Sequence, residues 1–175
     1  MGYAVSWLAI RGKSPGTVLE ELGFRIAGQR QAVPEFPVVQ AMLPNDWQLI
    51  FANDFGFASG VSLAQLSSGA EIVTCSLEEH VMQSTASAWR DGVRVWQVTH
   101  EFARGLEDLT AEGDLPASFA AIRGRLFQEQ AESGEEGSGI DMVFDIPIEL
   151  ARSVTGYQHD RDIPGAGEKP FEKLE

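Results

Sequence analysis

Cysteine is almost missing from this 175-residue chain: Cys75 is the single one, so no internal disulfide can form. It shares one face of a strand-like pattern with Val73 and Leu77, which predicts a buried, unreactive thiol. Long apolar runs are missing too, and none approaches the roughly 18 residues of a membrane-spanning helix. The first residues lack the basic region and cleavage site of a signal peptide. We therefore expect a cytoplasmic protein with no membrane partner.

Basic residues are scarce as well. The chain has 13 Lys and Arg against 26 Asp and Glu, for a formal net charge of -13. Most of the excess falls late in the chain, because residues 101–175 hold 17 acidic and 7 basic residues, against 9 and 6 in residues 1–100. A negative field of this size opposes binding to nucleic acid phosphates and anionic lipids. It excludes nucleic acid as the expected partner and allows a basic protein.

Motifs of known catalytic or metal sites are also lacking. His80, His100 and His159 show none of the spacings of zinc-binding motifs, and no nucleophile-elbow pattern occurs. The tripeptide 12–14, Gly-Lys-Ser, has the form of the end of a phosphate-binding loop, but Trp7 stands where that loop needs a glycine. We predict no catalytic residue, cofactor or metal site, and we favour a non-enzymatic role.

What is present is a stretch of three strand patterns, about residues 70–101, around which we expect the chain to pack. The pair Asp91-Gly92 is typical of a two-residue hairpin turn, and it predicts the register of the strands on either side. In that register four pairs share one face: Trp89 with Arg94, Ser87 with Trp96, Thr85 with Val98, and Gln83 with His100. The small residues of the opposite face are predicted to lie under helices.

The remaining patterns predict an α+β fold, a single domain over residues 1–156 with a mainly antiparallel sheet and three or four helices. The longest helix is expected at about 116–131, with an apolar stripe that packs on the small-residue face of the sheet. Residues 36–43, flanked by prolines, are expected to form an edge strand. Residues 157–175 are polar and rich in Gly and Pro, so we expect a tail that is surface-draped or disordered.

Two sets of residues are candidates for binding. The first is the tryptophan face of the predicted hairpin, a surface suited to a flat ligand or a partner's apolar group: Trp89, Arg94, Trp96, His100 and Gln83. The alternative is that these tryptophans only form a second layer that the fold covers. The second set is an acidic patch without intervening basic residues: Glu129, Glu132, Glu135, Glu136, Asp141 and Asp145. Its alternative is a solvated face that only confers solubility.

Two functions follow from these sets. The first is an acidic cytoplasmic binding protein that engages a basic protein partner, since opposite charge raises the rate of association. Small inhibitor and immunity proteins use this device, but the likeness is one of charge and size only. The second is a small-molecule-binding protein or enzyme whose site is the tryptophan face. The sequence leaves both open.

Overall fold

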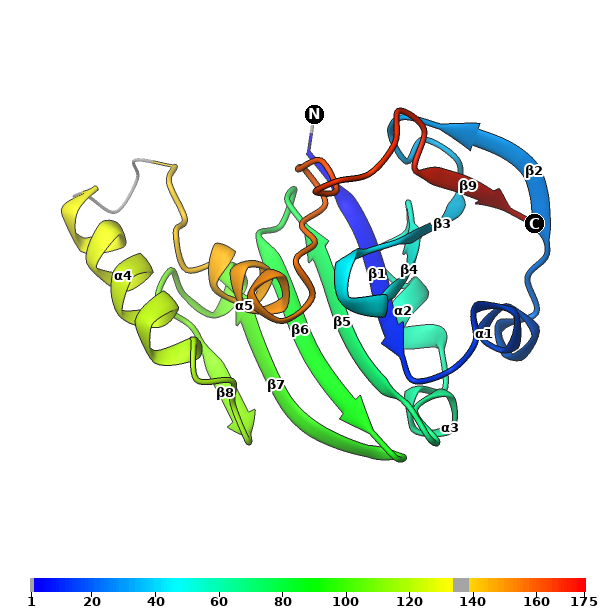
Figure 1. Cartoon of the computed structure of the whole chain (residues 1–175). Helices are drawn as coiled ribbons and strands as arrows, with labels where there is room; N and C mark the ends of the chain where they lie inside the picture. Colours follow the sequence, from blue (N-terminus) through cyan, green and yellow to red (C-terminus); the bar gives the residue numbers. More distant parts are fainter. Residues whose placement is uncertain (1, 134–138) are drawn as a thin grey trace.

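The computed structural model describes residues 2–133 and 139–175, and its strands form one nine-stranded sheet (Figure 1). All strand pairings within these ranges are antiparallel, in the order β2-β9-β3-β4-β1-β5-β6-β7-β8. The strands are β1 (Ala4–Arg11), β2 (Ile26–Gln31), β3 (Val38–Met42), β4 (Gln48–Ala52), β5 (Glu71–Glu78), β6 (Gln83–Arg90), β7 (Val93–Glu101), β8 (Thr110–Gly113) and β9 (Phe171–Leu174). The predicted α+β fold with a mainly antiparallel sheet is confirmed.

Five helices accompany this sheet in the described part of the chain: α1 (Pro15–Leu22), α2 (Phe57–Gly60), α3 (Leu63–Leu66), α4 (Phe119–Glu132) and α5 (Asp145–Thr155). Local sequence sets the bounds of α1, because the Ser14 hydroxyl accepts a hydrogen bond from the Thr17 N–H and Gly23 ends the helix at φ 76°. Single 3-10 turns lie at Pro44–Asp46 and Phe102–Arg104. No helix among the described residues is long and apolar enough to cross a membrane.

The sheet separates two apolar layers, and β1 lies at its centre. Alternate side chains of β1 point to opposite faces, as the two-residue period of a strand requires. Val5 and Trp7 pack into the layer that contains α4 and α5, whereas Leu8 and Ile10 pack into the layer that contains α1, α2 and α3. The strand is therefore buried on both sides. Cys75 of the neighbouring β5 is fully buried, and burial raises the pKa of its thiol to about 12.

The predicted meander is confirmed as β5, β6 and β7, and its last turn is built as expected. Asp91 and Gly92 both adopt positive φ, 47° and 80°, as a two-residue hairpin turn of this kind requires. Small side chains of β6 face the layer of α4 and α5, again as expected, and the Ser84 hydroxyl donates a hydrogen bond to the Phe144 carbonyl at 2.7 Å.

The helix that lies directly on the small-residue face is α5, not α4. Helix α5 contacts β5, β6 and β7, and α4 packs against α5 (Figure 1). The apolar stripe of α4 still faces the core, with Leu126 fully buried and three half-buried neighbours, Phe119, Ile122 and Phe127. The prediction of the long helix is confirmed, but its place directly on the sheet was wrong because α5, with its own apolar face, occupies that position.

The expectation that residues 157–175 form a surface-draped or disordered tail is wrong for residues 171–174. Residues 171–174 form β9, which pairs with β2 on one side and with β3 on the other. Phe171 and Leu174 are buried, as are Tyr157 and Ile163 in the connection that leads to the strand. Strand β3 is consequently internal to the sheet and not an edge strand. The physical reason is that apolar residues recur among the polar residues of this segment, and these apolar side chains are buried in the core.

Candidate functional site

The register predicted for the tryptophan face holds for only one pair. Trp89 lies opposite Arg94, but the next pair is Ala88 with Trp96, so Val95 is an extra residue on β7. Beyond this bulge every pairing is shifted by one position: Ser87 pairs with Gln97, Thr85 with Thr99, Gln83 with Glu101, and His100 with Ser84. The predicted register is therefore wrong beyond Trp89, because a shift of one residue moves each side chain to the other face.

This shift removes two of the five residues from the predicted tryptophan face. Trp96 is only 4% exposed and His100 is fully buried, and both lie on the face that α5 covers. Trp89 is half-buried against the layer of α1, α2 and α3, and the Arg94 guanidinium donates to Gln97 and to Glu112. Gln83 is half-buried at the start of β6. The structure thus does not bring these five residues together on one surface.

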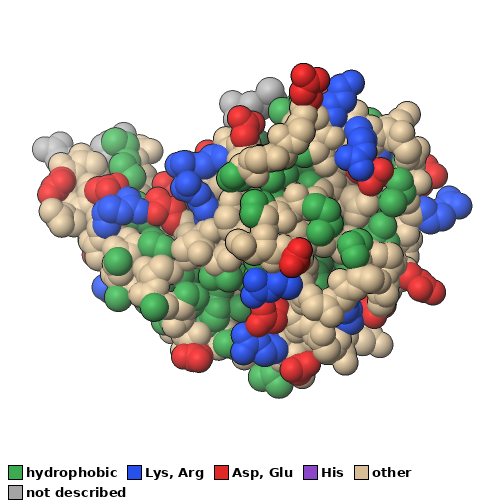
Figure 2. Space-filling view, in the orientation of Figure 1, with side chains coloured by type: hydrophobic (Ala, Val, Ile, Leu, Met, Phe, Trp, Pro, Cys, Tyr) green, Lys and Arg blue, Asp and Glu red, His purple; other side chains and the backbone are tan. Residues whose placement is uncertain are grey.

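The predicted acidic patch is likewise divided. Glu129 accepts a hydrogen bond from Arg125, and Glu132 accepts one from Gln128. Asp141 is buried against His100, and Asp145 is half-buried at the start of α5. Glu135 and Glu136 lie outside the described residues. On the face drawn in Figure 2, the coloured acidic and basic side chains are interspersed, so the excess charge does not gather there in one patch.

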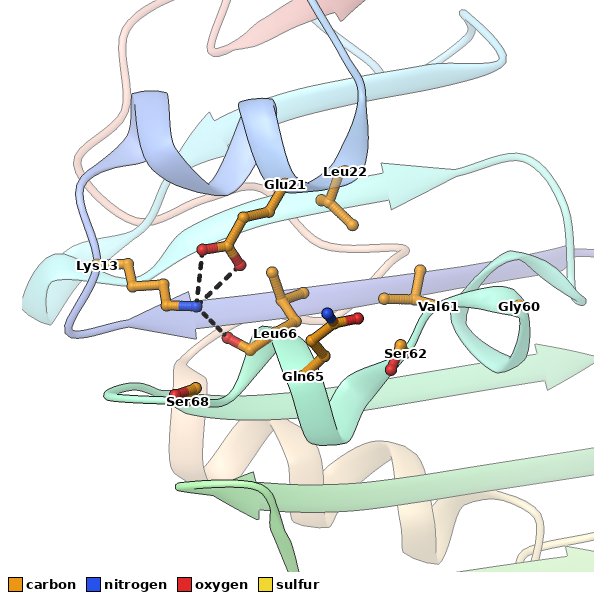
Figure 3. A pocket seen from close by; sticks show the side chains of 9 residues that line it. All are labelled: Lys13, Glu21, Leu22, Gly60, Val61, Ser62, Gln65, Leu66 and Ser68. Carbon is orange, nitrogen blue, oxygen red and sulfur yellow. Dashed lines mark hydrogen bonds and ion pairs between the residues drawn. The ribbon is translucent and has the colours of Figure 1, made fainter.

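A first pocket lies around Lys13 and has a volume of about 690 Å³ (Figure 3). The Lys13 ammonium group is directed between α1 and α3, where it donates to both carboxylate oxygens of Glu21 (3.0 and 2.8 Å) and to the Leu66 carbonyl (2.8 Å). Three acceptors saturate its three donors. The lysine of the phosphate-loop-like tripeptide therefore has no donor left for an anion, which agrees with the rejection of that motif on sequence.

A second pocket, of about 1070 Å³, is lined by Tyr3 near the amino terminus and by residues of the connection between α5 and β9. Figure 1 shows that this connection passes close to the amino terminus. We call this pocket the acidic pocket. Its walls come from segments far apart in the sequence: Tyr3, residues 32–35 of the β2–β3 connection, two residues of the β4 region (Phe51 and Asn53), and residues 159–163, 166–168, 170 and 171. Since β9 ties the last segment between β2 and β3, the fold itself holds these walls together.

Four carboxylates line the acidic pocket, those of Glu35, Asp160, Asp162 and Glu168. Arg161 is the one Lys or Arg residue of the lining. All four are exposed, and none makes an ion pair or a side-chain hydrogen bond with the described part of the chain. Apolar side chains, Phe51, Ile163 and Phe171 among them, make up much of the remaining wall. The pocket therefore combines uncompensated negative charge with an apolar lining, which suits a cation on an apolar stem.

His159 also lines this pocket, and its ring is held in place from two sides. Its ring meets that of Tyr3 edge-on, with centroids 4.7 Å apart, and its side chain is only 5% exposed. Its Nε2 lies 3.9 Å from Glu79 Oε1, while its Nδ1 is buried and has no hydrogen-bond partner among the described residues. Burial lowers the pKa of this imidazole, although Asp160 and Glu79 act in the opposite direction. A buried polar atom without a partner is uncommon in folded proteins.

Asp145 at the start of α5 is affected by burial and by nearby carboxylates, among them Asp160 of the acidic pocket. Burial raises the pKa of this carboxyl to about 6, and the nearby charges of Glu149, Asp141, Asp160 and Glu79 add to the effect. Because the pKa in the folded state lies above the usual 3.8, folding favours the protonated carboxyl. The contribution of the protonated Asp145 carboxyl to the stability of the fold is complete below pH 3.8 and is lost as the pH rises through 6.

This shift predicts that Asp145→Asn stabilises the protein at neutral pH. Asparagine has nearly the shape of the protonated carboxyl and carries no charge, so the variant avoids the cost of burying a charged carboxylate and the repulsion from its acidic neighbours. We expect an increase in unfolding free energy on the order of 1–2 kcal/mol at pH 7.5 and no change near pH 3.5. Urea denaturation at the two pH values measures both, and a variant that is equally stabilised at both would contradict the titration of Asp145 as the cause.

Sequence reasoning missed the acidic pocket because it assigned residues 157–175 to a polar tail. The neighbours His159, Asp160 and Asp162 were visible as a group, but nothing local places them beside Tyr3 or Glu35. The available signal was the spacing of apolar residues through the segment, at Tyr157, Ile163, Phe171 and Leu174, which is uncommon in a disordered tail. No group of three or more His, Cys, Asp or Glu side chains in residues 2–133 and 139–175 could hold a metal ion.

Comparison with known proteins gives no family to which the chain can be assigned: no family model, no curated protein and no solved structure matches it.

Proposed function

We propose that this is an acidic binding protein that engages a basic protein partner through the acidic pocket. The observation that carries the proposal is the set of four exposed carboxylates that pair with no described residue, against one basic residue, around an apolar wall. Carboxylates arranged in this way steer a cationic partner toward the site and disfavour an anionic one. The net charge of -13 acts in the same direction.

The partner is proposed to be a protein because of the size and shape of the pocket. At about 1070 Å³ it exceeds the volume of one side chain, and several of its charged residues lie in two exposed connections. Loops held by a rigid scaffold are common sites of recognition. A basic loop or chain segment of a partner fits this arrangement, with its cationic side chains between the carboxylates and its apolar atoms on the wall.

Binding of decalysine tests the proposal. We expect the wild-type protein to bind decalysine at 20 mM NaCl, and we expect the affinity to fall by at least about tenfold at 500 mM NaCl because salt screens exposed charges. Decaglutamate should not bind. Isothermal titration calorimetry measures all three. Equal binding of the acidic and the basic peptide would contradict the proposal.

A pair of matched variants locates the binding. The double variant Asp160→Asn/Asp162→Asn removes two charges from the acidic pocket and should weaken decalysine binding by about tenfold. The control Glu20→Gln/Glu107→Gln removes the same charge from exposed residues on α1 and on the β7–β8 connection, and its affinity should stay within about twofold of the wild type. Equal weakening in both variants would show that decalysine responds only to net charge.

A further inference from the structure

We propose that the pocket around Lys13 binds a small zwitterion with an apolar side group, such as the α-amino acid leucine. This site is separate from the acidic pocket, because the two pockets share no lining residue. Its volume of about 690 Å³ lies in the range of roughly 300–1,000 Å³ that is usual for small-molecule sites. Helices α1 and α3 form its two walls, and the charged groups between these helices indicate the class of ligand (Figure 3).

The lining of this pocket holds one positive and one negative charge, fixed side by side. Lys13 and Glu21 are the only charged residues among the nine that line it. The Lys13 ammonium group contacts both oxygens of the Glu21 carboxylate and is held in this position by the Leu66 carbonyl. A ligand with one charge gains little here, because attraction to one member of the pair is opposed by repulsion from the other. A molecule with both charges can place each beside its opposite, so the pair favours a zwitterion.

Glu21 and Gln65 offer polar contacts to such a ligand from opposite walls of the pocket. The Glu21 side chain is 38% exposed, and its contact with Lys13 leaves a lone pair free on each carboxylate oxygen, so it can accept a hydrogen bond from a ligand ammonium group. The Gln65 side chain is exposed, forms no hydrogen bond with the described part of the chain, and extends from α3 into the space between the helices (Figure 3). Its amide N–H groups can donate to the ligand carboxylate.

Apolar side chains line the part of the pocket away from Lys13. Figure 3 shows Leu22 on the α1 wall and Val61 on the opposite wall, next to the start of α3. Both side chains are half-buried and pack against the layer of α1, α2 and α3, so each keeps some surface in contact with water. An apolar side group of the ligand would cover this surface, which favours binding. Leucine gains this contribution, whereas glycine, which has no side chain, does not.

Four small molecules test the inference: L-leucine, leucinamide, which has only the ammonium charge, N-acetyl-L-leucine, which has only the carboxylate charge, and glycine. We expect L-leucine to bind with a Kd of about 1 mM or less, and each of the other three to bind at least about tenfold more weakly. NMR titration of the ¹⁵N-labelled full chain gives the affinities, and the backbone amide signals of Leu22, Val61 and Gln65 should shift with L-leucine. Unshifted signals at these residues, or an affinity for L-leucine no higher than for the other three, would overturn the inference.

Two variants that each remove one charge test the role of the pair. Glu21→Gln leaves the Lys13 charge uncompensated and should make N-acetyl-L-leucine bind at least about tenfold more tightly than leucinamide, whereas Lys13→Met should produce the opposite preference. The control Glu20→Gln removes a charge from α1 outside the pocket lining and should keep the preference for L-leucine. Thermal unfolding shows whether the variants are folded. Retention of the wild-type preference in folded Glu21→Gln would overturn the inference, and it would leave the decalysine result at the acidic pocket unchanged.

Discussion

Replacing His100 with leucine should lower the unfolding free energy by about 3–5 kcal/mol, as the removal of one partner of a buried ion pair does. The His100 side chain is fully buried, and that of Asp141 is 4% exposed. His100 Nδ1 lies 2.6 Å from the Asp108 carbonyl, which can only accept, and Nε2 lies 2.8 Å from Asp141 Oδ2. Both nitrogens therefore carry protons. Leucine would leave the Asp141 carboxylate buried and without its counter-charge. Urea denaturation measures the loss.

A double variant separates the loss of charge from the loss of packing. His100→Leu/Asp141→Asn removes both charges but keeps an oxygen that can accept the Phe144 N–H, as Asp141 Oδ1 does at 3.1 Å. It should recover a large part of the stability that the single variant loses. If the double variant is as unstable as the single one, packing and not the uncompensated carboxylate is the cause.

The same pair predicts a dependence on pH. Burial opposes the charge of His100, but the hydrogen bonds to Asp141 and to the Asp108 carbonyl raise the pKa above 6.5. The contribution of the charged imidazole is therefore complete below pH 6.5 and is lost as the pH rises through the higher pKa of the folded state. In His100→Leu this part of the pH dependence should disappear.

Leu174→Asp should destabilise the protein by several kcal/mol, because it buries an unpaired carboxylate. Leu174 is 4% exposed and packs into the layer of α1, α2 and α3. Its strand, β9, provides the only strand pairing of β2 within the described residues. The loss of β9 would therefore also detach β2 from the sheet. Hydrogen exchange at the β2 amides, together with thermal unfolding, measures both effects.

Leu174→Met is the matched control, since it conserves volume and apolar character and should cost less than about 1.5 kcal/mol. Equal unfolding temperatures for the aspartate variant and the wild type would show that residues 171–174 do not hold the sheet together.

Sequence reasoning succeeded where the signal is local. The turn at Asp91-Gly92 is defined by two adjacent residues that both tolerate positive φ, and the α4 stripe is defined by residues within four turns of helix. It failed at Val95, where the bulge depends on another strand. The Val95 carbonyl accepts the Asp114 N–H at 2.8 Å, and Gly113 approaches so closely that an added Cβ would lie 2.2 Å from the same oxygen. Nothing within β6 or β7 indicates this constraint.

The acidic pocket could not be predicted for the same reason, because it depends on contacts between segments that are even farther apart in the sequence. Its carboxylates lie on two connections, and only the pairing of β9 with β2 and β3 brings these together. The composition of the chain predicted an affinity for a basic partner, but it could not indicate which acids remain unpaired. The structure supplies that distinction: Asp141 is neutralised by His100, whereas Asp160 and Asp162 are not paired with any described residue.

The position of β9 has a consequence for the order in which the molecule folds. The Gln40 side chain on β3 donates a hydrogen bond to Glu172 on β9 across 132 positions of sequence, so this part of the sheet cannot form until residues 171–174 have left the ribosome. The meander of β5, β6 and β7, by contrast, contains only pairings between neighbouring strands. Since contacts between distant residues form slowly, we expect the meander to form early and the acidic pocket to be among the last parts assembled. During synthesis the meander would then form before the acidic pocket.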